Sequence, residues 1–337
     1  MNYKNLTLDK TMYQSSQGSF AQQLEELDPT ADYAGTPLGG LDAYQRQLKR
    51  FDIKVKGESS NTVEKFFATS SSAALFPEYV SRAVHQGMEE QTILDSITAS
   101  RTNVSSMDYR SISVDNAQDV MELREVAEGA EIPETTIRLK ETLVRMKKRG
   151  RMLVASYEAL RFQRLDLFTV ALRQIGSYIA KSQLEDAVQV LIAGDGSPES
   201  AAQVIQTAGA QVAYGDLVAL WEQFQDYQMN TLLVAPDMAA KMLALAEFKD
   251  PATGLGFQNS GKLGTPLGAV MIKTAAVPAG TVVALDSRCA LEMVTAGPVQ
   301  VDYDKLISRQ LERAAITSIA GFVKLFPDAV KVLTLKS

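Results

Sequence analysis

The glycine-rich segment from Gly256 to Leu263 is the part of the sequence that comes closest to a motif for chemistry. It reads GFQNSGKL and has the G-x4-G-K spacing of a phosphate-binding loop. Leu263, however, stands where such a loop needs a serine or threonine to hold magnesium. A helix and a charged turn are predicted before the segment, instead of the strand that would place phosphates at a helix N-terminus. We interpret it as a flexible loop and predict no cofactor.

Other residue types that carry catalysis are scarce. His85 is the single histidine, so a Ser-His-Asp, Cys-His or histidine-based zinc site would have to use it. It lies on a predicted helix one turn before Glu89, which favours a surface imidazole near a carboxylate. Cys289 stands in an apolar, strand-like run and is expected to fill a core. No carboxylate pair has a spacing typical of a general acid and base, so we predict no catalytic or metal residue and no enzyme activity.

One strong charge asymmetry remains, a basic segment from Arg138 to Arg151. It could contact phosphates, or it could be the solvated or subunit-facing edge of a ribbon, where lysines also oppose aggregation. No aromatic residues are interleaved as stacking platforms, which argues against single-strand binding. We favour contact between subunits, with an acidic loop of a neighbour as partner. The predicted interface residues are Glu122, Glu125, Glu128, Arg138, Lys140, Arg145, Lys147, Lys148 and Arg149.

Composition limits the class of protein. The chain has 337 residues, 46% of them hydrophobic and 22% charged, and a formal net charge of −6. This length predicts a large core in two lobes or domains, and the acidic balance argues against a dedicated nucleic-acid binder. A single cysteine excludes an intrachain disulfide and suits a reducing compartment. No export signal and no apolar run approaching ~18 residues is present, so we expect neither secretion nor membrane spanning.

Two runs of alternating apolar and polar residues flank the acidic loop. They extend from Tyr109 to Val114 and from Thr135 to Leu143. Two such runs joined by a polar loop predict a long two-stranded hairpin. A two-stranded ribbon is marginal in water by itself. If it projects from its own domain, we expect it to pack on a neighbouring subunit.

One very long helix is predicted from Tyr157 to Ile192. Ser156 is placed to cap its N-terminus, Gly194 follows its last turn, and Gly176 is the only weak breaker inside it. About 36 residues at ~1.5 Å each give a rod of roughly 54 Å. A compact enzyme domain rarely needs such a rod, whereas a subunit that spans a shell does. Apolar residues recur with helical spacing at Phe168, Leu172, Ile175, Ile179, Ala187 and Leu191.

The remaining elements are shorter. The first forty residues show no sustained apolar period and are predicted to form an extended arm with little helix. A short helix is expected over 41–50, a strand over 51–56 and a helix from Pro77. The second half mixes helices and strands, including TLLVA, AVMIKT, TVVALDS and VKVLTL. This is an α+β composition without the βαβ rhythm of a dinucleotide-binding fold.

The order of these elements resembles the major capsid proteins of tailed phages, the Hong Kong 97 type. The segments that carry the resemblance are FATSSSAALFPEYVSRAV (67–84), EGAEIPETTIRLKE (128–141) and the long helix with its basic approach (147–196). In the second half, VAPDMAAKM, GTPLGAVMI and ERAAITSIAGFVKL are similar to the axial lobe and the closing peripheral strands. The resemblance covers residues 51–335.

This resemblance implies an α+β fold of the Hong Kong 97 type, with an N-arm, an extended β-hairpin loop, a long spine helix, and peripheral and axial domains. The implied ranges are an N-terminal arm (1–90), the extended hairpin loop with flanking strands (91–156), the spine helix and peripheral domain (157–213), the axial domain (214–298) and peripheral return strands (299–337). Many relatives begin with a helical, charged scaffolding segment that is later removed. The first forty residues here are short of both properties, so a separate scaffolding protein, or none, is expected.

The function implied by the resemblance is that of a major capsid protein. Its copies would self-assemble in the host bacterial cytoplasm into hexamers and pentamers of an icosahedral phage head, part of a virion that encloses double-stranded DNA. The implied partners are other copies of the chain, a portal, scaffolding or decoration proteins and non-specifically packaged DNA, without a membrane. An encapsulin-like nanocompartment is the alternative, which the long N-terminal arm disfavours. A weaker alternative, that the chain is a soluble nucleotide-binding enzyme, is supported only by the segment beginning at Gly256.

Overall fold

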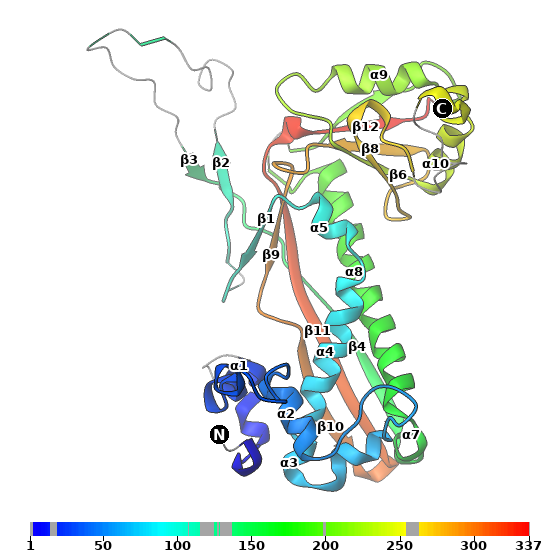
Figure 1. Ribbon diagram of the computed structural model, residues 1–337. Coiled ribbons are helices and arrows are strands. Elements are labelled where there is room, and N and C mark those ends of the chain that lie inside the picture. The colour runs from blue at the N-terminus through cyan, green and yellow to red at the C-terminus, as the bar shows by residue number, and fades with distance from the viewer. Residues whose placement is uncertain are drawn as a thin grey trace. The chain divides into compact units, whose positions relative to one another are not determined.

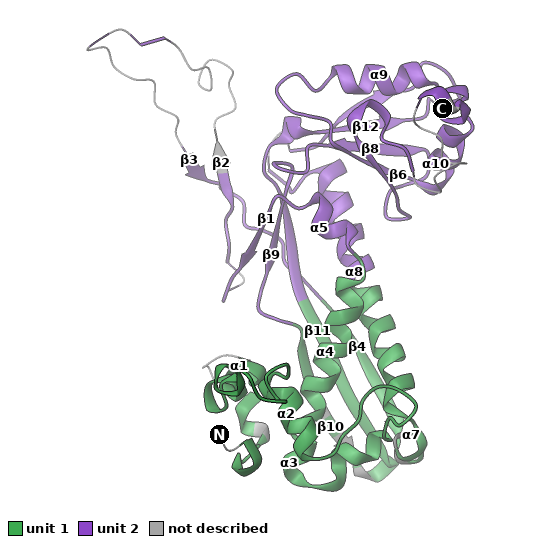
Figure 2. Ribbon diagram, viewed as in Figure 1, with its two compact units in different colours: residues 1–91, 149–179, 299–318 green, residues 92–148, 180–298, 319–337 purple. Residues whose placement is uncertain are grey.

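The computed structural model describes residues 3–13, 19–106, 108–114, 125–126, 128, 137–197, 200–253 and 263–336. The chain forms two compact units (Figure 2). Unit 1 comprises residues 1–91, 149–179 and 299–318, and unit 2 comprises residues 92–148, 180–298 and 319–337. Helices and strands are mixed in both units, as the α+β composition predicts (Figure 1).

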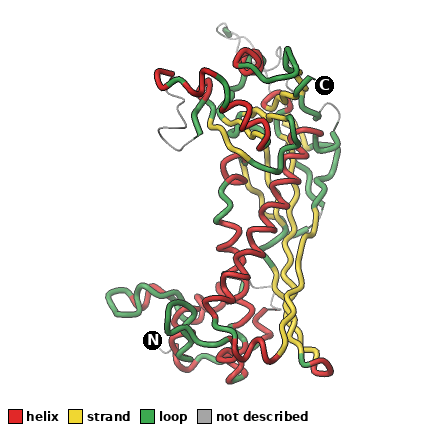
Figure 3. Tube along the Cα trace, turned by 90° about the vertical axis from the view of Figure 1, so that its right-hand side faces the viewer, coloured by secondary structure: helices red, strands yellow, loops and turns green. Residues whose placement is uncertain are grey.

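Unit 1 combines helices with three long strands. Its strands pair in the order β4-β11-β10, and β10 runs antiparallel to β11. Figure 3 shows the helices of this unit on one side of these strands. The helices are α1 (Phe20–Leu27), α2 (Ala43–Arg50), α3 (Ser70–Ala73), α4 (Phe76–Glu89), α7 (Tyr157–Phe162) and the first part of α8 (Leu165–Ala193). The strands are β4 (Lys147–Ser156), β10 (Gln300–Leu306) and β11 (Leu311–Lys324), of which β4 and β11 continue into unit 2. Short 3-10 helices lie at Tyr3–Asn5, Lys10–Tyr13, Thr30–Tyr33, Val63–Ala68 and Ile307–Arg309.

Unit 2 is built on a five-stranded sheet of order β5-β12-β8-β6-β7. The strands of unit 2, inside and outside this sheet, are β1 (Ser100–Asn103), β2 (Ile112–Val114), β3 (Ile137–Leu139), β5 (Gln203–Gln206), β6 (Thr231–Val234), β7 (Val270–Lys273), β8 (Thr281–Leu285), β9 (Leu291–Thr295) and β12 (Val330–Thr334). Its helices are α5 (Ile93–Ile97), the last part of α8, α9 (Tyr214–Glu222), α10 (Pro236–Leu243) and α11 (Ala246–Lys249), with 3-10 turns at Pro251–Thr253, Pro266–Gly268 and Pro327–Ala329.

The chain returns to unit 2 within β11, at residue 319. β12 lies inside the five-stranded sheet, antiparallel to β8 and parallel to β5. The range 299–337, predicted as one set of return strands, is therefore divided between the two units. Every residue of β8 and β6 is buried, because strands inside a covered sheet have both faces packed.

The first forty residues differ from the predicted arm with little helix. Within them, α1 begins with a complete capping box from Ser19. The short helix predicted over 41–50 is confirmed as α2, which has a capping box from Asp42. Phe20 is buried in the core of unit 1. Arg46 is fully buried and donates from Nε to the Asp28 carboxylate at 2.6 Å. The prediction was wrong because this segment is ordered by local caps and a buried ion pair, which weak apolar periodicity does not reveal.

The strand predicted over 51–56 is also wrong. Phe51 is the C-cap of α2, and Asp52 takes a left-handed backbone conformation with φ of 50°. Lys54 and Asn61 then exchange hydrogen bonds that close a local turn. Ile53 is buried in the core of unit 1, but the alternating residues around it do not pair with another strand.

The long helix is shorter than predicted. α7 and α8 are separated at Gln163, whose backbone is extended (φ −74°, ψ 125°). The carbonyl of Gln163 accepts from Val63 N–H, and Leu165 N–H donates to the Asn61 carbonyl. These backbone groups bond to a distant segment, so the helical ladder is interrupted there. The predicted cap is confirmed, because the Ser156 hydroxyl accepts from Ala159 N–H at 3.1 Å, and α8 still has 29 residues.

Helices α4 and α8 contact each other backbone to backbone within unit 1. A Cβ atom added at Gly87 would overlap with the carbonyl oxygen of Arg173, and one added at Gly176 would overlap with the carbonyl oxygen of Val84. Gly176, which the sequence marks only as a weak breaker, is therefore the residue that lets the two helices approach. Neither overlap can be relieved by turning a side chain.

Replacing Gly176 with alanine should destabilise the protein by about 3 kcal/mol, because the added methyl group must push the helix backbones apart. An interior glycine in a helix normally gains up to about 1 kcal/mol on this change, so the expected sign is reversed. Thermal unfolding of Gly176→Ala measures the effect. Gly215→Ala in α9, where a Cβ atom meets open space, is the matched control and should be neutral or stabilising. Equal behaviour of the two variants would contradict the close helix contact.

Candidate assembly surface

The base of the predicted hairpin is present and places apolar side chains at the surface. β2 and β3 pair antiparallel, with Ile112 opposite Leu139 and Val114 opposite Ile137. Directly opposite residues share a face of a ribbon, so Ile112, Ile137 and Leu139 lie on one face. Their exposed fractions are 46%, 65% and 68%. We call this the hairpin face, and unit 2 leaves it largely unburied.

The predicted acidic partner loop follows β2. Glu125 and Glu128 are exposed, and Glu122 lies outside the described residues. Its contact with the basic segment of a neighbour stays a prediction.

The structure divides the predicted basic residues by exposure. Arg138, Arg145 and Lys148 are exposed, whereas Arg149 is half-buried. Arg138 lies on β3, and Lys148 lies on β4. These three exposed cations are available to a neighbouring molecule, and their assignment to an interface also stays a prediction.

Two other members of the predicted set are engaged within the chain. Lys140 Nζ lies 2.7 Å from Asp195 Oδ2, and both side chains are nearly buried. Lys147 Nζ lies 2.7 Å from Asp186 Oδ1. Burial makes the Lys140 pair hard to exchange for an external partner, because the separated charges would each need new solvation. Lys140 therefore acts as an internal anchor of the hairpin.

A buried carboxylate that the sequence analysis missed lies beside the base of the hairpin. Glu292 on β9 is 4% exposed and accepts from Thr102 Oγ1 at 2.6 Å, from Tyr109 Oη at 2.8 Å and from the Ser111 hydroxyl. Burial and this carboxylate raise the pKa of Tyr109. The only available signal in the sequence is a single acid in the otherwise apolar run LEMVT.

A second buried charge lies next to the Lys140 anchor. Lys324 is fully buried, and its Nζ donates to the Ser200 carbonyl at 3.0 Å. Its own carbonyl accepts from Lys140 Nζ at 2.7 Å. Burial lowers the pKa of Lys324 from its ordinary value of 10.5 to about 8. Burial alone would raise the pKa of Asp195, but hydrogen bonds from Lys140 and Ser197 hold it below its ordinary value.

Unit 1 has exposed apolar side chains of its own. Leu167 and Val170 project from one face of α8, and Met152 and Val154 from one face of β4, with half or more of each side chain exposed. Phe162 at the end of α7 is 75% exposed. Large exposed apolar residues gathered on one unit are typical of surfaces that associate.

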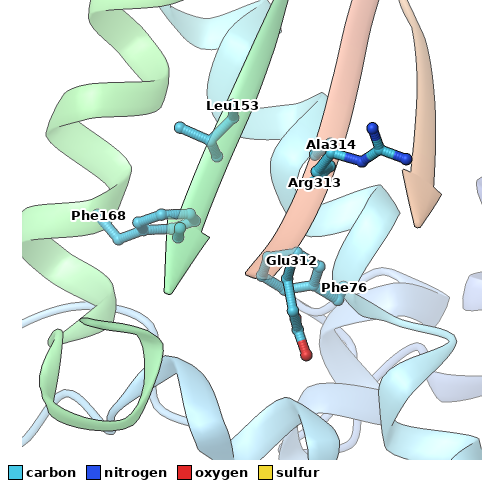
Figure 4. A pocket seen from close by; sticks show the side chains of 7 residues that line it. Phe76, Leu153, Phe168, Glu312, Arg313 and Ala314 are labelled. Atoms are coloured by element: carbon cyan, nitrogen blue, oxygen red, sulfur yellow. The ribbon is translucent and has the colours of Figure 1, made fainter. Parts of the chain in front are cut away.

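A small apolar slot in unit 1 offers no catalytic arrangement. Figure 4 shows Leu153 of β4 and Phe168 of α8 facing it. Its lining contains no histidine, cysteine or hydroxyl side chain that could act as a nucleophile. The lining residues are Phe76, Leu153, Ala155, Phe168, Glu312, Arg313 and Ala314.

The remaining sequence motifs do not combine into a site. His85 is half-buried on α4. Cys289 lies in a turn, packs against the core of unit 2, and has a pKa raised to about 11 by burial and by Asp286, so its thiol is a poor nucleophile. The segment Gly256 to Lys262 lies outside the described residues. Among the described residues, no three histidine, cysteine or acidic side chains gather as a metal site requires. No helix in the described parts of the chain has the length and apolar content needed to cross a bilayer.

Comparison with known families gives a direct assignment. The profile of the phage capsid protein family matches residues 140–326, more than half of the chain. The chain therefore belongs to the phage capsid protein family. No curated protein matches the chain in sequence.

Several solved structures share the fold. The capsid of cyanophage P-SCSP1u aligns with a TM-score of 0.54 and 12% identity, over 73% of this chain and 88% of that one. The capsid of an empty GTA particle aligns with a TM-score of 0.52 and 16% identity, over 72% and 89%. The virus-like particle from Pyrococcus furiosus aligns with a TM-score of 0.51 and 12% identity, over 77% and 99%. At these identities the similarity shows the fold alone.

The family match and the fold together confirm the sequence-based interpretation. This is a phage major capsid protein with the Hong Kong 97-type fold. Its family is one of structural proteins.

The buried ammonium of Lys324 should make stability depend on pH. Its pKa is depressed in the folded state, so the unfolded chain binds more protons between about pH 8 and 10.5, and stability rises with pH in that window. Between these two pH values the free energy of unfolding of the wild type should rise by up to about 3 kcal/mol relative to that of Lys324→Met. Denaturant unfolding of unassembled protein at both pH values measures this. Lys324→Met also loses the hydrogen bond to Ser200, which changes the difference in unfolding free energy by the same amount at every pH. The dependence of that difference on pH is therefore the test. Lys148→Met controls for loss of an exposed cation, and a difference that does not change with pH would contradict the prediction.

Proposed function

We propose that copies of this chain assemble into the hexamers and pentamers of an icosahedral phage head that encloses double-stranded DNA. The observation that carries the proposal is the hairpin face in a chain of the phage capsid protein family. An apolar strand face that its own unit leaves exposed becomes buried when a neighbouring copy covers it. The role of the chain is mechanical: it supplies a stiff body with an appendage that reaches other copies.

Burial of the hairpin face supplies a useful share of the association energy. Ile112, Ile137 and Leu139 are each about half exposed or more. Covering them would contribute about 1 kcal/mol or more for each side chain. A shell repeats this contact at every subunit, so a modest contribution per hairpin is multiplied over the particle. Reversible assembly benefits from contacts that are individually weak.

Charge complements the apolar contact. We assign the exposed cations Arg138, Arg145 and Lys148 to the side of the interface that meets the acidic loop of a neighbour, which contains Glu125 and Glu128. Exposed ion pairs are worth about 1 kcal/mol or less and are screened by salt. They therefore contribute more to the relative position in which two subunits dock than to the strength of their association.

The binding partners that we assign are those of a shell that encloses DNA. A net charge of −6 suits a wall that encloses DNA without binding it tightly. We assign the protein to the virion, after assembly in the host bacterial cytoplasm, with a portal and separate scaffolding or decoration proteins as further partners. Particles purified from lysed host cells should contain nuclease-protected DNA. A co-purifying enzyme in place of DNA would favour the encapsulin-like alternative.

Replacing Ile137 and Leu139 with threonine should reduce assembly at least tenfold. Threonine keeps the strand propensity but removes much of the apolar area, so each subunit loses roughly 2 kcal/mol of contact energy. Electron microscopy of the purified protein, with sedimentation to quantify closed shells, measures the yield. Val204→Thr on β5, where valine is 55% exposed outside the hairpin, is the control and should assemble normally. Wild-type protein that forms no shells at any concentration would contradict the proposed function itself.

A further inference from the structure

The Glu292 carboxylate is an unusual group because it is buried and its neighbours in the described part of the chain are hydroxyls. Its hydrogen-bond partners are the hydroxyls of Thr102, Tyr109 and Ser111. Among the described residues, no lysine or arginine forms an ion pair with it. A buried carboxylate in this state depends on every donor it has, because each hydrogen bond to a charged acceptor is stronger than a neutral one.

The donors come from two places in unit 2. Thr102 lies on β1, which pairs in parallel with β9. Tyr109 and Ser111 lie just before β2, in the first arm of the hairpin. Glu292 on β9 therefore connects β1, the strand beside it, to the hairpin base by side chains alone.

The same hairpin residues also connect to the second arm. The Ser111 carbonyl accepts from Lys140 N–H at 2.8 Å, and the Tyr109 carbonyl accepts from Val144 N–H at 2.9 Å. These two bonds extend the β2–β3 ladder toward the sheet. Val144 in turn packs in a small cluster of buried residues with Val294 of β9.

The second arm has its own attachment, at a different place. Lys140 Nζ donates to Asp195 and to the Lys324 carbonyl, and Thr142 Oγ1 lies 2.9 Å from Ser197 Oγ. The hairpin base is thus held at one point by the Glu292 carboxylate of β9 and at another by its own Lys140 ammonium. Two separate attachments prevent rotation about either one.

We propose that Glu292 is a positioning residue for assembly, which fixes the base of the β2–β3 hairpin on β9 and so sets the direction in which the hairpin meets a neighbouring copy. This inference rests on the proposed function of the hairpin in shell assembly. Without the Glu292 contacts the first arm keeps only its backbone bonds to the second arm and the packing of the Tyr109 ring against the cluster of Val144 and Val294, and the hairpin face samples many directions. Assembly then loses both rate and uniformity, although the core of unit 2 is unchanged.

The test compares hydroxyl donors that share one acceptor. Tyr109→Phe with Ser111→Ala removes the hairpin donors, and Thr102→Val removes the donor from β1 while leaving the hairpin attached. Amide hydrogen exchange of unassembled protein over residues 109–114 should rise at least tenfold in the double variant and less than threefold in Thr102→Val. The yield of shells of uniform diameter should fall at least tenfold in the double variant alone.

Thermal unfolding shows whether each variant is folded. If the double variant does not fold, Ser111→Ala is compared with Ser111→Thr, which keeps the hydroxyl and should restore both readouts. Equal effects of the hairpin and β1 variants would overturn the proposal, because Glu292 would then only stabilise unit 2. Faster exchange with normal shells would overturn it as well. If wild-type protein makes no shells, the proposed function fails, while the exchange comparison still tests the attachment.

Discussion

An apolar strand face in contact with water is the constraint on which the behaviour of this protein depends. Ile112, Ile137 and Leu139 lie on one face of a two-stranded ribbon, a structure that is marginal without something to pack against. Within the described residues, the core clusters of both units are complete without these three side chains. The subunit can therefore fold first and bury the hairpin face later, against another copy. In the proposed assembly, folding and association would use different apolar surfaces.

Unit 1, which does not carry the hairpin, has rigid internal contacts of its own. In unit 1, α4 and α8 touch through their backbones at Gly87 and Gly176, so their separation is set by main-chain atoms. The buried pair of Arg46 with Asp28 holds the first helices of the chain in the same unit. Main-chain contacts and buried ion pairs both resist small displacements, since neither can be relaxed by rotating a side chain into solvent.

Polar groups with a high desolvation cost gather at the base of the hairpin. Glu292, the Lys140–Asp195 pair and Lys324 are all buried or nearly so. Apolar side chains of similar size would give a more stable unit, since the pKa of Lys324 is lowered by the cost of burying its charge. Directional hydrogen bonds, however, define an orientation that apolar contacts leave loose. The arrangement gives up some stability for a defined hairpin base.

Local patterns in the sequence determined most of the elements and the family. The alternation around the acidic loop predicts the hairpin, the cap at Ser156 and the apolar period predict α8, and their order indicates the capsid fold. Tertiary structure alone decided the break at Gln163, the role of Gly176 and the partners of Glu292. Periodicity and capping act over a few residues, so they are visible in one stretch of sequence. A helix interrupted by pairing with residues 61–63, a glycine selected by another helix, and a carboxylate satisfied from segments about 180 residues earlier depend on contacts that only the folded chain brings together.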